Sequence, residues 1–276
     1  MAIVTIARQV AALGDEIAAS LSRKLGYSFV DRHQIEERIV SLGFPRNKLP
    51  KYDERKPGFF ASMAKDRDEY LNYLEYAVLE AAEKSDCVII GRGAFAILDE
   101  LPNLVKFKFV APDDIRIERL KNEFNWNEKQ AQARINESSS NRKGFHKSFF
   151  NVNQEDPANY LLTLNTGLLS IEECVKVCET LVKTHVDSAK EDAGKKRAAN
   201  LFKAQTLVNK LLFDCKLPVS FLHADINEDG SVVTLLGVVD SQAAADNAVD
   251  TAARIYPSVV IKSAITVVQD FKNFHA

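Results

Sequence analysis

The sequence has no apolar run long enough to span a membrane and no low-complexity tract, although 46% of its 276 residues are hydrophobic. A transmembrane helix needs about 20 consecutive apolar residues. Cysteine is scarce, with 4 in the chain, and no signal peptide is recognisable. These absences predict reduced thiols and a cytoplasmic protein. The formal net charge of -2 argues against a nucleic-acid binder that works through bulk positive charge, so any anion site must be local.

The cysteines give no indication of a metal site. Cys174 and Cys178 lie on a predicted helix, but no second pair of Cys or His residues matches them. Free cysteine is among the most buried residue types, so both side chains are expected to pack in the core.

Short apolar runs alternate with helical patterns through the larger, N-terminal part of the chain. The expected strands are Ile3–Ala7, Ser28–Val30, Cys87–Ile90, Val105–Val110 and Tyr160–Leu164. The expected helices are Glu16–Leu25, Arg32–Leu42, Asp68–Lys84, Asp113–Phe124 and Ile171–Val186. This order predicts a parallel sheet covered on both faces, with ligands bound beyond the carboxyl ends of the strands.

The pattern changes after Lys190–Arg197, a charged stretch without large apolar side chains that indicates a linker or a solvated helix start. The elements expected beyond it are a helix at Leu201–Leu212, strands at Val219–Ile226 and Ser231–Val239, a helix at Ala243–Ile255 and a strand at Val259–Val268. The turn Asn227–Gly230 favours a hairpin. We therefore expect a nucleotide-binding domain at 1–187, a linker at 188–199 and a small α+β domain at 200–276.

The turn after the first strand lies where a phosphate-binding loop would lie but has little of its chemistry. Such a loop uses glycines for close backbone approach, a lysine for the phosphates and a Ser or Thr hydroxyl for Mg²⁺. Here Gly14 is the glycine that remains, no lysine precedes a hydroxyl residue, and Asp15 and Glu16 open the next helix. The turn predicts a nucleotide-kinase scaffold with impaired catalysis.

Arginines follow the strands of this predicted sheet. In chain order they are Arg8, Arg32 and Arg92 after the first three strands, and Arg116 and Arg119 in the helix after the fourth. Guanidinium groups suit phosphate oxygens, whereas each arginine alone could equally be solvated surface. Arg92 is the strongest candidate, because the flanking Gly91 and Gly93 favour a tight turn with close ligand approach.

A further basic cluster lies in the polar stretch 134–150, where a mobile lid is expected. Its members are Arg134, Arg142, Lys143, His146 and Lys147.

Several segments, taken in order, resemble a known family over about residues 1–185. They are Ile3–Arg8, Glu16–Ala18, Phe29–Asp31, Val88–Arg92, Ala111–Arg119, Asn159–Thr166 and Leu169–Glu173. They look like the cytidylate-kinase-like family of P-loop nucleoside monophosphate kinases. The resemblance implies a five-stranded parallel sheet with an arginine-bearing lid. It also implies transfer of the ATP γ-phosphoryl group to CMP or a similar monophosphate, with ATP and Mg²⁺ as cofactors if the protein is active.

The resemblance also implies residue roles. Arg92 would hold the acceptor phosphate or base, and Asp31 would face the acceptor. Arg116 and Arg119 would lie near the donor and Arg142 would close on the transferred phosphoryl group, so these three are the expected catalytic residues. The expected substrate-binding residues are Arg8, Gly14, Asp31, Arg32, Gly91 and Arg92, and no metal ligand is assigned.

The chain departs from the family pattern in its loop. Ala11, Ala12 and Leu13 replace the central glycine-containing triplet, so Cβ atoms occupy the path of the phosphate. No acidic residue ends the third strand to hold Mg²⁺.

The C-terminal segment Lys216–Phe271 resembles a BON domain, a small αββαβ module associated with phospholipid or ligand binding. The matching features are Gly230–Val239, the alanine-rich helix after it and the closing strand Ile261–Val268. The resemblance implies a protein or lipid ligand, and an accessory role in assembly is an equal alternative. The expected fold is thus an α/β, parallel-sheet P-loop kinase-like domain followed by a small α+β, BON-like domain.

Three functions stay open on these residues. The first is a cytidylate-kinase-like protein that binds a nucleotide or another phosphorylated small molecule, with or without transfer of the ATP γ-phosphoryl group. The second is a catalytically impaired regulatory protein that senses a nucleotide or anion and signals through its C-terminal domain. The third is a purely structural interaction protein that binds no nucleotide and no other anion.

Overall fold

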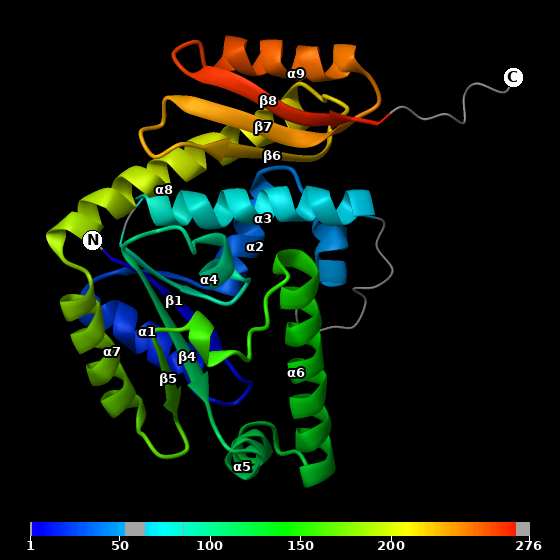
Figure 1. Ribbon diagram of the computed structural model, residues 1–276. Coiled ribbons are helices and arrows are strands. Elements are labelled where there is room, and N and C mark those ends of the chain that lie inside the picture. Colours follow the sequence, from blue (N-terminus) through cyan, green and yellow to red (C-terminus); the bar gives the residue numbers. More distant parts are fainter. Residues whose placement is uncertain (1, 53–63, 85, 269–276) are drawn as a thin grey trace, which may run out of the picture. The chain divides into compact units, whose positions relative to one another are not determined.

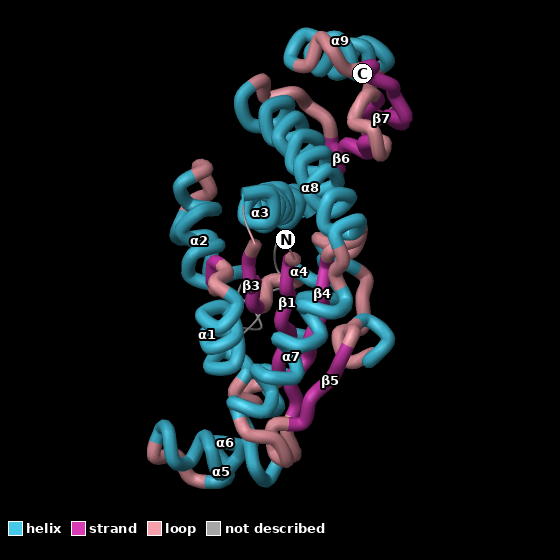
Figure 2. Tube along the Cα trace, turned by 90° about the vertical axis from the view of Figure 1, so that its left-hand side faces the viewer, coloured by secondary structure: helices cyan, strands magenta, loops and turns pink. Residues whose placement is uncertain are grey.

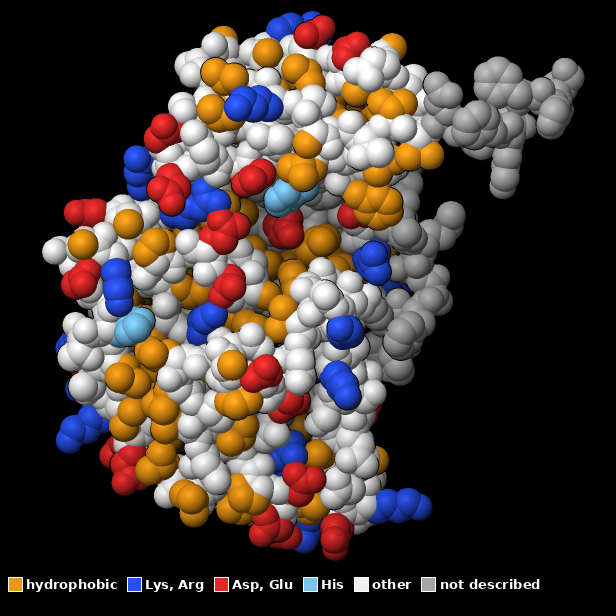
Figure 3. Space-filling model, viewed as in Figure 1, with side chains coloured by type: hydrophobic (Ala, Val, Ile, Leu, Met, Phe, Trp, Pro, Cys, Tyr) orange, Lys and Arg blue, Asp and Glu red, His pale blue; other side chains and the backbone are white. Residues whose placement is uncertain are grey.

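The computed structural model describes residues 2–52, 64–84 and 86–268, which form two compact units. The first unit is drawn from Met1–Met63 and Lys84–Lys195, and the second from Ala64–Glu83 and Lys196–Ala276. No helix in the described part of the chain is long and apolar enough to cross a bilayer. On the face seen in Figure 3, basic and acidic side chains are interspersed, in keeping with the formal net charge of -2.

The first unit contains a five-stranded parallel sheet with the strand order β2-β3-β1-β4-β5. Figure 1 labels β1, β4 and β5, and Figure 2 shows β3, β1, β4 and β5 in this order. Its strands are β1 (Ile3–Arg8), β2 (Ser28–Val30), β3 (Cys87–Ile90), β4 (Leu104–Val110) and β5 (Leu162–Asn165). The central strand β1 pairs with both β3 and β4, and Ile3 lies opposite Cys87 on one side and Leu104 on the other. The expected parallel α/β class is confirmed. This arrangement brings the carboxyl ends of β1, β3 and β4 to one edge.

The helices of this unit connect and cover the strands. They are α1 (Gly14–Leu25), α2 (Arg32–Ser41), the 3₁₀ helix η1 (Arg46–Tyr52), α4 (Ala94–Ile97), α5 (Asp113–Phe124), α6 (Glu128–Phe150), the 3₁₀ helix η3 (Pro157–Asn159) and α7 (Ile171–His185). One core cluster joins the sheet to α1 and α7, with Ile17, Leu21, Cys174 and Cys178 fully buried in it. Burial raises the pKa of the Cys178 thiol to about 12, so this cysteine packs as a small apolar group, as expected.

The stretch 134–150, expected as a lid between a helix and a strand, belongs to the single helix α6. The helix begins with a capping box, in which the Asn127 side chain accepts from the Gln130 N–H and the Gln130 side chain accepts from the Asn127 N–H. Its buried face carries the polar side chains of Ser138, Arg142 and His146. A helix whose inner face is partly polar lacks the apolar stripe that marks an amphipathic helix, which explains the difference.

The second unit contains a three-stranded sheet with the order β6-β7-β8 (Figure 1). Strand β6 (Ser220–Ile226) is antiparallel to β7 (Val232–Val239), and β8 (Val260–Val267) is parallel to β7. The turn at Asn227–Gly230 joins β6 and β7 into the expected hairpin. The remaining elements are α8 (Ser188–Asn209), the π-helical turn η4 (Lys210–Asp214) and α9 (Gln242–Ile255). The small α+β architecture is confirmed, and residues 188–199, expected as a linker, are helical.

Helix α3 (Ala64–Lys84) groups with the second unit although its sequence lies between β2 and β3. The Tyr73 ring stacks on Phe213 with centroids 4.3 Å apart. Gln205 Nε2 donates to Asn72 Oδ1 at 3.1 Å. These contacts are long-range in sequence, so a pattern of apolar spacing cannot predict them.

Candidate functional site

The loop between β1 and α1 bends through two non-glycine residues in the left-handed region, Ala11 with φ 58° and Leu13 with φ 56°. Side chains with a Cβ seldom adopt this conformation. Leu13 is the N-cap of α1 and makes no side-chain capping bond, while Asp15 and Glu16 lie in the first turn. Their carboxylates compensate the positive end of the helix dipole, which in a phosphate-binding loop attracts the ligand.

Arg119 fastens this loop to the sheet. Its Nη1 donates to the carbonyl oxygen of Ala11 at 2.9 Å, and its Nη2 donates to the carbonyl oxygen of Thr166 at 2.6 Å. Gln9 Oε1 also accepts from the Ala111 N–H at 3.1 Å. Arg119, which the resemblance places near the phosphoryl donor, thus uses two of its nitrogen atoms to hold backbone, and it also lines a cavity next to this loop.

That cavity, the loop-side pocket, has a volume of about 290 Å³ and lies between the loop and helices α5 and α6. Its basic and acidic lining residues are equal in number: Arg119, Arg134 and Arg142 against Asp15, Glu16 and Glu123. Phe124 and Trp126, stacked with centroids 4.7 Å apart, add an aromatic wall. Equal numbers of opposite charges give this pocket no net attraction for a polyanion.

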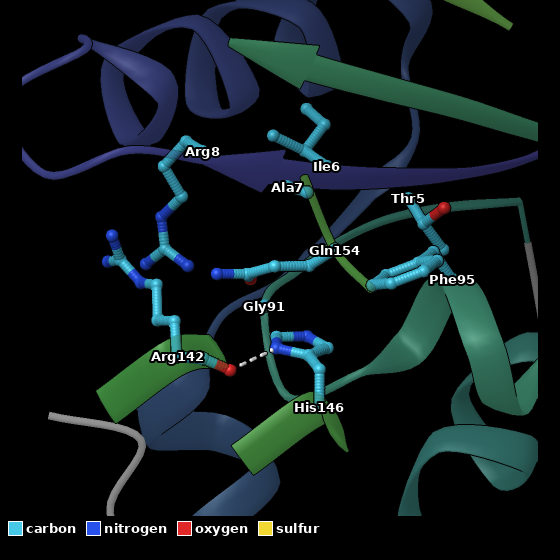
Figure 4. A pocket seen from close by; sticks show the side chains of 9 residues that line it. All are labelled: Thr5, Ile6, Ala7, Arg8, Gly91, Phe95, Arg142, His146 and Gln154. Atoms are coloured by element: carbon cyan, nitrogen blue, oxygen red, sulfur yellow. Dashed lines mark hydrogen bonds between the residues drawn. The ribbon is translucent and has the colours of Figure 1, made fainter. Parts of the chain in front are cut away.

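A second cavity, the arginine pocket, lies at the carboxyl edge of the sheet (Figure 4). It is lined by Thr5, Ile6, Ala7, Arg8, Gly91, Phe95, Arg142, His146 and Gln154, and none of these described residues is acidic. The side chains of Arg8 and Arg142 point into it from β1 and α6, and the Gln154 amide points toward their guanidinium groups. Arg142 lines both pockets and connects them.

Arg8 is held in the arginine pocket by a carboxylate from the neighbouring helix. Its Nε and Nη2 donate to the two oxygens of Asp15, each at 3.1 Å, and the side chain of Arg8 is 4% exposed while that of Asp15 is 61% exposed. Gly14 permits this arrangement, because a Cβ there would lie 2.5 Å from the Cβ of Arg8. The predicted residue Gly14 therefore acts by making room for Arg8.

Two side chains of α6, one turn apart, form the opposite wall. Arg142 and His146 are both buried, and His146 Nδ1 lies 2.8 Å from the carbonyl oxygen of Arg142. A carbonyl oxygen only accepts, so Nδ1 carries a proton and donates. The His146 ring also stacks on Phe95 with centroids 5.4 Å apart. The buried hydroxyl of Thr5, which also lines the pocket, has no hydrogen-bond partner among the described residues.

Arg92 lies inside the fold, and its guanidinium binds other residues of the chain. Its side chain is 1% exposed, its Nη1 donates to the carbonyl oxygen of Tyr52 at 2.9 Å, and its Nη2 is paired with the Glu36 carboxylate. Arg32 Nε donates to the same carboxylate at 2.7 Å. Glu36 therefore joins two of the predicted arginines, and only Gly91 of the Gly-Arg-Gly motif lines the arginine pocket.

The close approach expected at this motif comes from the protein itself. Arg92 has φ 55° between Gly91 at φ 77° and Gly93 at φ 70°. A Cβ on Gly93 would lie 2.1 Å from the Phe150 ring, so the end of α6 requires a glycine there.

Two further predicted residues line neither pocket. Asp31 caps α2, where its carboxylate accepts from the Gln34 N–H at 2.9 Å. Arg116 is buried and donates to Asp113, while its Nε and Nη1 have no hydrogen-bond partner in the part of the chain that the structure describes. The structure thus gathers Arg8, Gly91 and Arg142 in one pocket and Arg119 and Arg142 in the other, and it places Asp31, Arg32, Arg92 and Arg116 outside both.

The sequence analysis missed Glu36 and Gln154. Glu36 follows Arg32 by one helical turn, a spacing that signals an ion pair. Gln154 lies in an irregular segment between α6 and β5, where no periodic pattern indicates which way a side chain points. The described residues contain no group of three or more His, Cys, Asp or Glu side chains that could hold a metal ion.

The model of the cytidylate kinase-like family matches residues 3–168, more than half of the 276 residues. The chain belongs to the cytidylate kinase-like family. The match ends before Lys196–Ala276, the C-terminal part of the second unit, whose small α+β fold is not identified as a BON domain. A comparison with curated proteins gives no match.

Solved structures similar to this family member include an uncharacterized protein from Eubacterium ventriosum, at 19% identity and a TM-score of 0.54 over 67% of this chain and 99% of that one. A shikimate kinase from Bacteroides thetaiotaomicron follows at 16% identity and a TM-score of 0.42, over 66% and 98% of the two chains. A gluconokinase from Sinorhizobium meliloti has 12% identity and a TM-score of 0.40, over 66% and 91%. At these identities the first of these structures supports the fold alone.

Proposed function

We propose that this protein binds a nucleoside monophosphate, or another phosphorylated small molecule, with the phosphate in the arginine pocket. The observation that carries the proposal is the convergence of Arg8, Arg142 and the Gln154 amide on a pocket without an acidic lining residue. Two buried guanidinium groups that share one cavity favour an anion between them. Membership of the cytidylate kinase-like family supports CMP as the first ligand to test.

Binding requires an exchange at Arg8. The arginine pocket has a volume of about 10 Å³, roughly the room of one water molecule. A phosphate therefore enters by displacing the Asp15 carboxylate from Arg8. Because the Asp15 side chain is mostly exposed, it can turn into solvent at little cost.

We expect phosphoryl transfer from Mg·ATP to CMP to be far below the roughly 1–100 s⁻¹ of kinases. The loop-side pocket has the size for a donor, but its carboxylates oppose the phosphates of ATP. Its loop provides neither a lysine nor a hydroxyl ligand for Mg²⁺. ATP and Mg²⁺ remain the cofactors if transfer occurs.

A second candidate is a regulatory protein that reports the bound anion through its C-terminal part. The order α8-β6-β7-α9-β8 is the αββαβ order of a BON-like module, which favours this candidate. Such a module would bind a protein or lipid ligand. We propose that the protein acts in the cytoplasm.

Calorimetric titration of the full chain with CMP, and with ATP with and without Mg²⁺, tests the proposal. Trp126 is the chain's single tryptophan and lines the loop-side pocket, so its fluorescence reports donor-side occupancy in the same samples. We expect saturable CMP binding and little response to ATP. Absence of CMP binding would overturn the proposal, and turnover of at least 1 s⁻¹ would establish a working kinase.

A further inference from the structure

Strand β4 carries a lysine in the interior of the first unit. Lys108 is 4% exposed in the run Leu104–Val110, which is otherwise mostly apolar. Its Nζ donates to the carbonyl oxygen of Gln154 at 2.8 Å and to Glu155 Oε2 at 2.7 Å. The ammonium also lies 5.4 Å from the centroid of the Tyr160 ring. Burying an ammonium is unfavourable unless it is paired and hydrogen-bonded, and these contacts meet that need.

The same carbonyl group has a second buried donor. The Tyr160 hydroxyl donates to the carbonyl oxygen of Gln154 at 2.9 Å. Burial, with a smaller contribution from the Glu155 carboxylate, raises the pKa of Tyr160, so the hydroxyl keeps its proton. Lys108 on β4 and Tyr160, which lies just before β5, thus fix the backbone of Gln154. Gln154 itself belongs to no helix or strand.

Fixing this backbone orients the walls of the arginine pocket. The Gln154 side chain points into the pocket toward Arg8 and Arg142 (Figure 4). Tyr160 also packs against Phe95, with ring centroids 5.3 Å apart, and Phe95 lines the pocket. A buried side chain that binds the backbone behind a pocket residue, without lining the pocket itself, has the geometry of a positioning group.

We propose that Lys108 is a positioning residue for phosphate binding and that it acts through Gln154. The Gln154 NH₂ group then supplies the anion with a third donor beside the two guanidinium groups. This inference rests on the proposed function, because it assigns a role within the same pocket. In this role, the Gln154 amide contacts the phosphate directly, and Lys108 holds the Gln154 backbone in place.

A double-mutant cycle tests this pathway, with CMP as the probe and calorimetry of the full chain as the measurement. We expect Lys108→Met and Gln154→Ala each to weaken CMP binding about three- to tenfold, the range for one hydrogen bond. In the double variant, Lys108→Met should add nothing further, because its effect passes through the missing amide. A merely structural lysine would give additive losses, which would overturn the proposal.

The matched control is Lys106→Met on the same strand. Lys106 is partly exposed, pairs with Asp99 at 2.5 Å and lines no part of the arginine pocket, so CMP affinity should not change. If Lys108→Met fails to fold, Tyr160→Phe removes the other donor to Gln154 and should weaken CMP binding about two- to fivefold. An unchanged affinity in that variant would also overturn the proposal.

The outcomes separate this inference from the proposed function. If the wild-type chain does not bind CMP, the proposed function fails and the inference fails with it. If the wild type binds CMP and Arg142→Ala loses it while Lys108→Met binds normally, the inference alone fails.

Discussion

The arginine pocket and the loop-side pocket share Arg142 but differ in how they treat an anion. The first has basic and amide side chains and no acidic lining residue, whereas the second sets three carboxylates against three arginines. In the arginine pocket, an anion would be bound by side chains. In the loop-side pocket, the backbone of the loop between β1 and α1 would have to contact the phosphate. The anion binding that we propose therefore depends on side chains, beside a loop that lacks the lysine and the hydroxyl residue of phosphoryl transfer.

The largest expected effect is at Arg92, and it tests whether this arginine stabilises the fold or binds the ligand. Arg92→Ala should lower the free energy of unfolding by about 3–5 kcal/mol, because it leaves the Glu36 carboxylate with the partly exposed Arg32 alone and removes the donor to the Tyr52 carbonyl oxygen. Urea denaturation measures the change. The sequence instead favours Arg92 as a ligand-binding residue, for which CMP affinity would fall by about 1.5–3 kcal/mol. A loss of CMP affinity with normal stability would instead show that Arg92 binds the ligand.

Arg92 also shows how far the sequence predicts this site. The strands, their parallel arrangement and the arginines that follow them are predicted from periodicity and turn residues, and the parallel sheet is confirmed. The order of the strands in the sheet comes from the structure. Which way each arginine points depends on partners far away in the chain: Glu36 for Arg92, and the Ala11 carbonyl group for Arg119. No local pattern encodes those pairs. The sequence therefore predicts that the site lies at the carboxyl edge of the sheet, but it does not predict which side chains line the pocket.

The next effect compares Arg142, which lines both pockets, with Arg134, which lines only the loop-side pocket. Arg142→Ala should weaken CMP binding by about 1.5–3 kcal/mol, the range for hydrogen bonds to a charged group. Arg134→Ala should change it by less than about 0.5 kcal/mol, because Arg134 lines only the loop-side pocket and pairs with Glu137 at 3.0 Å. Calorimetry on both variants makes the measurement. Equal losses would mean that CMP occupies the loop-side pocket, which removes the distinction between the two.

A smaller effect tests the exchange at Arg8. Asp15→Asn removes the charge that competes with phosphate for this guanidinium and should tighten CMP binding by about 0.5–1 kcal/mol. Glu16→Gln, in the same helical turn, is the matched control, because Glu16 lines only the loop-side pocket and makes no described bond to Arg8. Titrations at two salt concentrations measure both variants. Tighter binding in both would indicate general charge repulsion, and no change in either would show that Asp15 does not compete.

The smallest expected effect is at Gly144, and it tests whether the stability of α6 can change without a change in CMP binding by Arg142, the residue of α6 that lines both pockets. Gly144 lies inside this helix between Arg142 and His146, and a Cβ at this position meets nothing within 4 Å. Gly144→Ala should therefore raise the free energy of unfolding by about 0.5–1 kcal/mol, through the helix propensity of alanine and the lower entropy of the unfolded chain. Urea denaturation and CMP titration of the same variant decide the point. If stability rises and CMP affinity is unchanged, α6 acts as a rigid carrier of Arg142. If CMP affinity falls as stability rises, binding requires α6 to bend at the glycine, and the two pockets would then differ in motion as well as in charge.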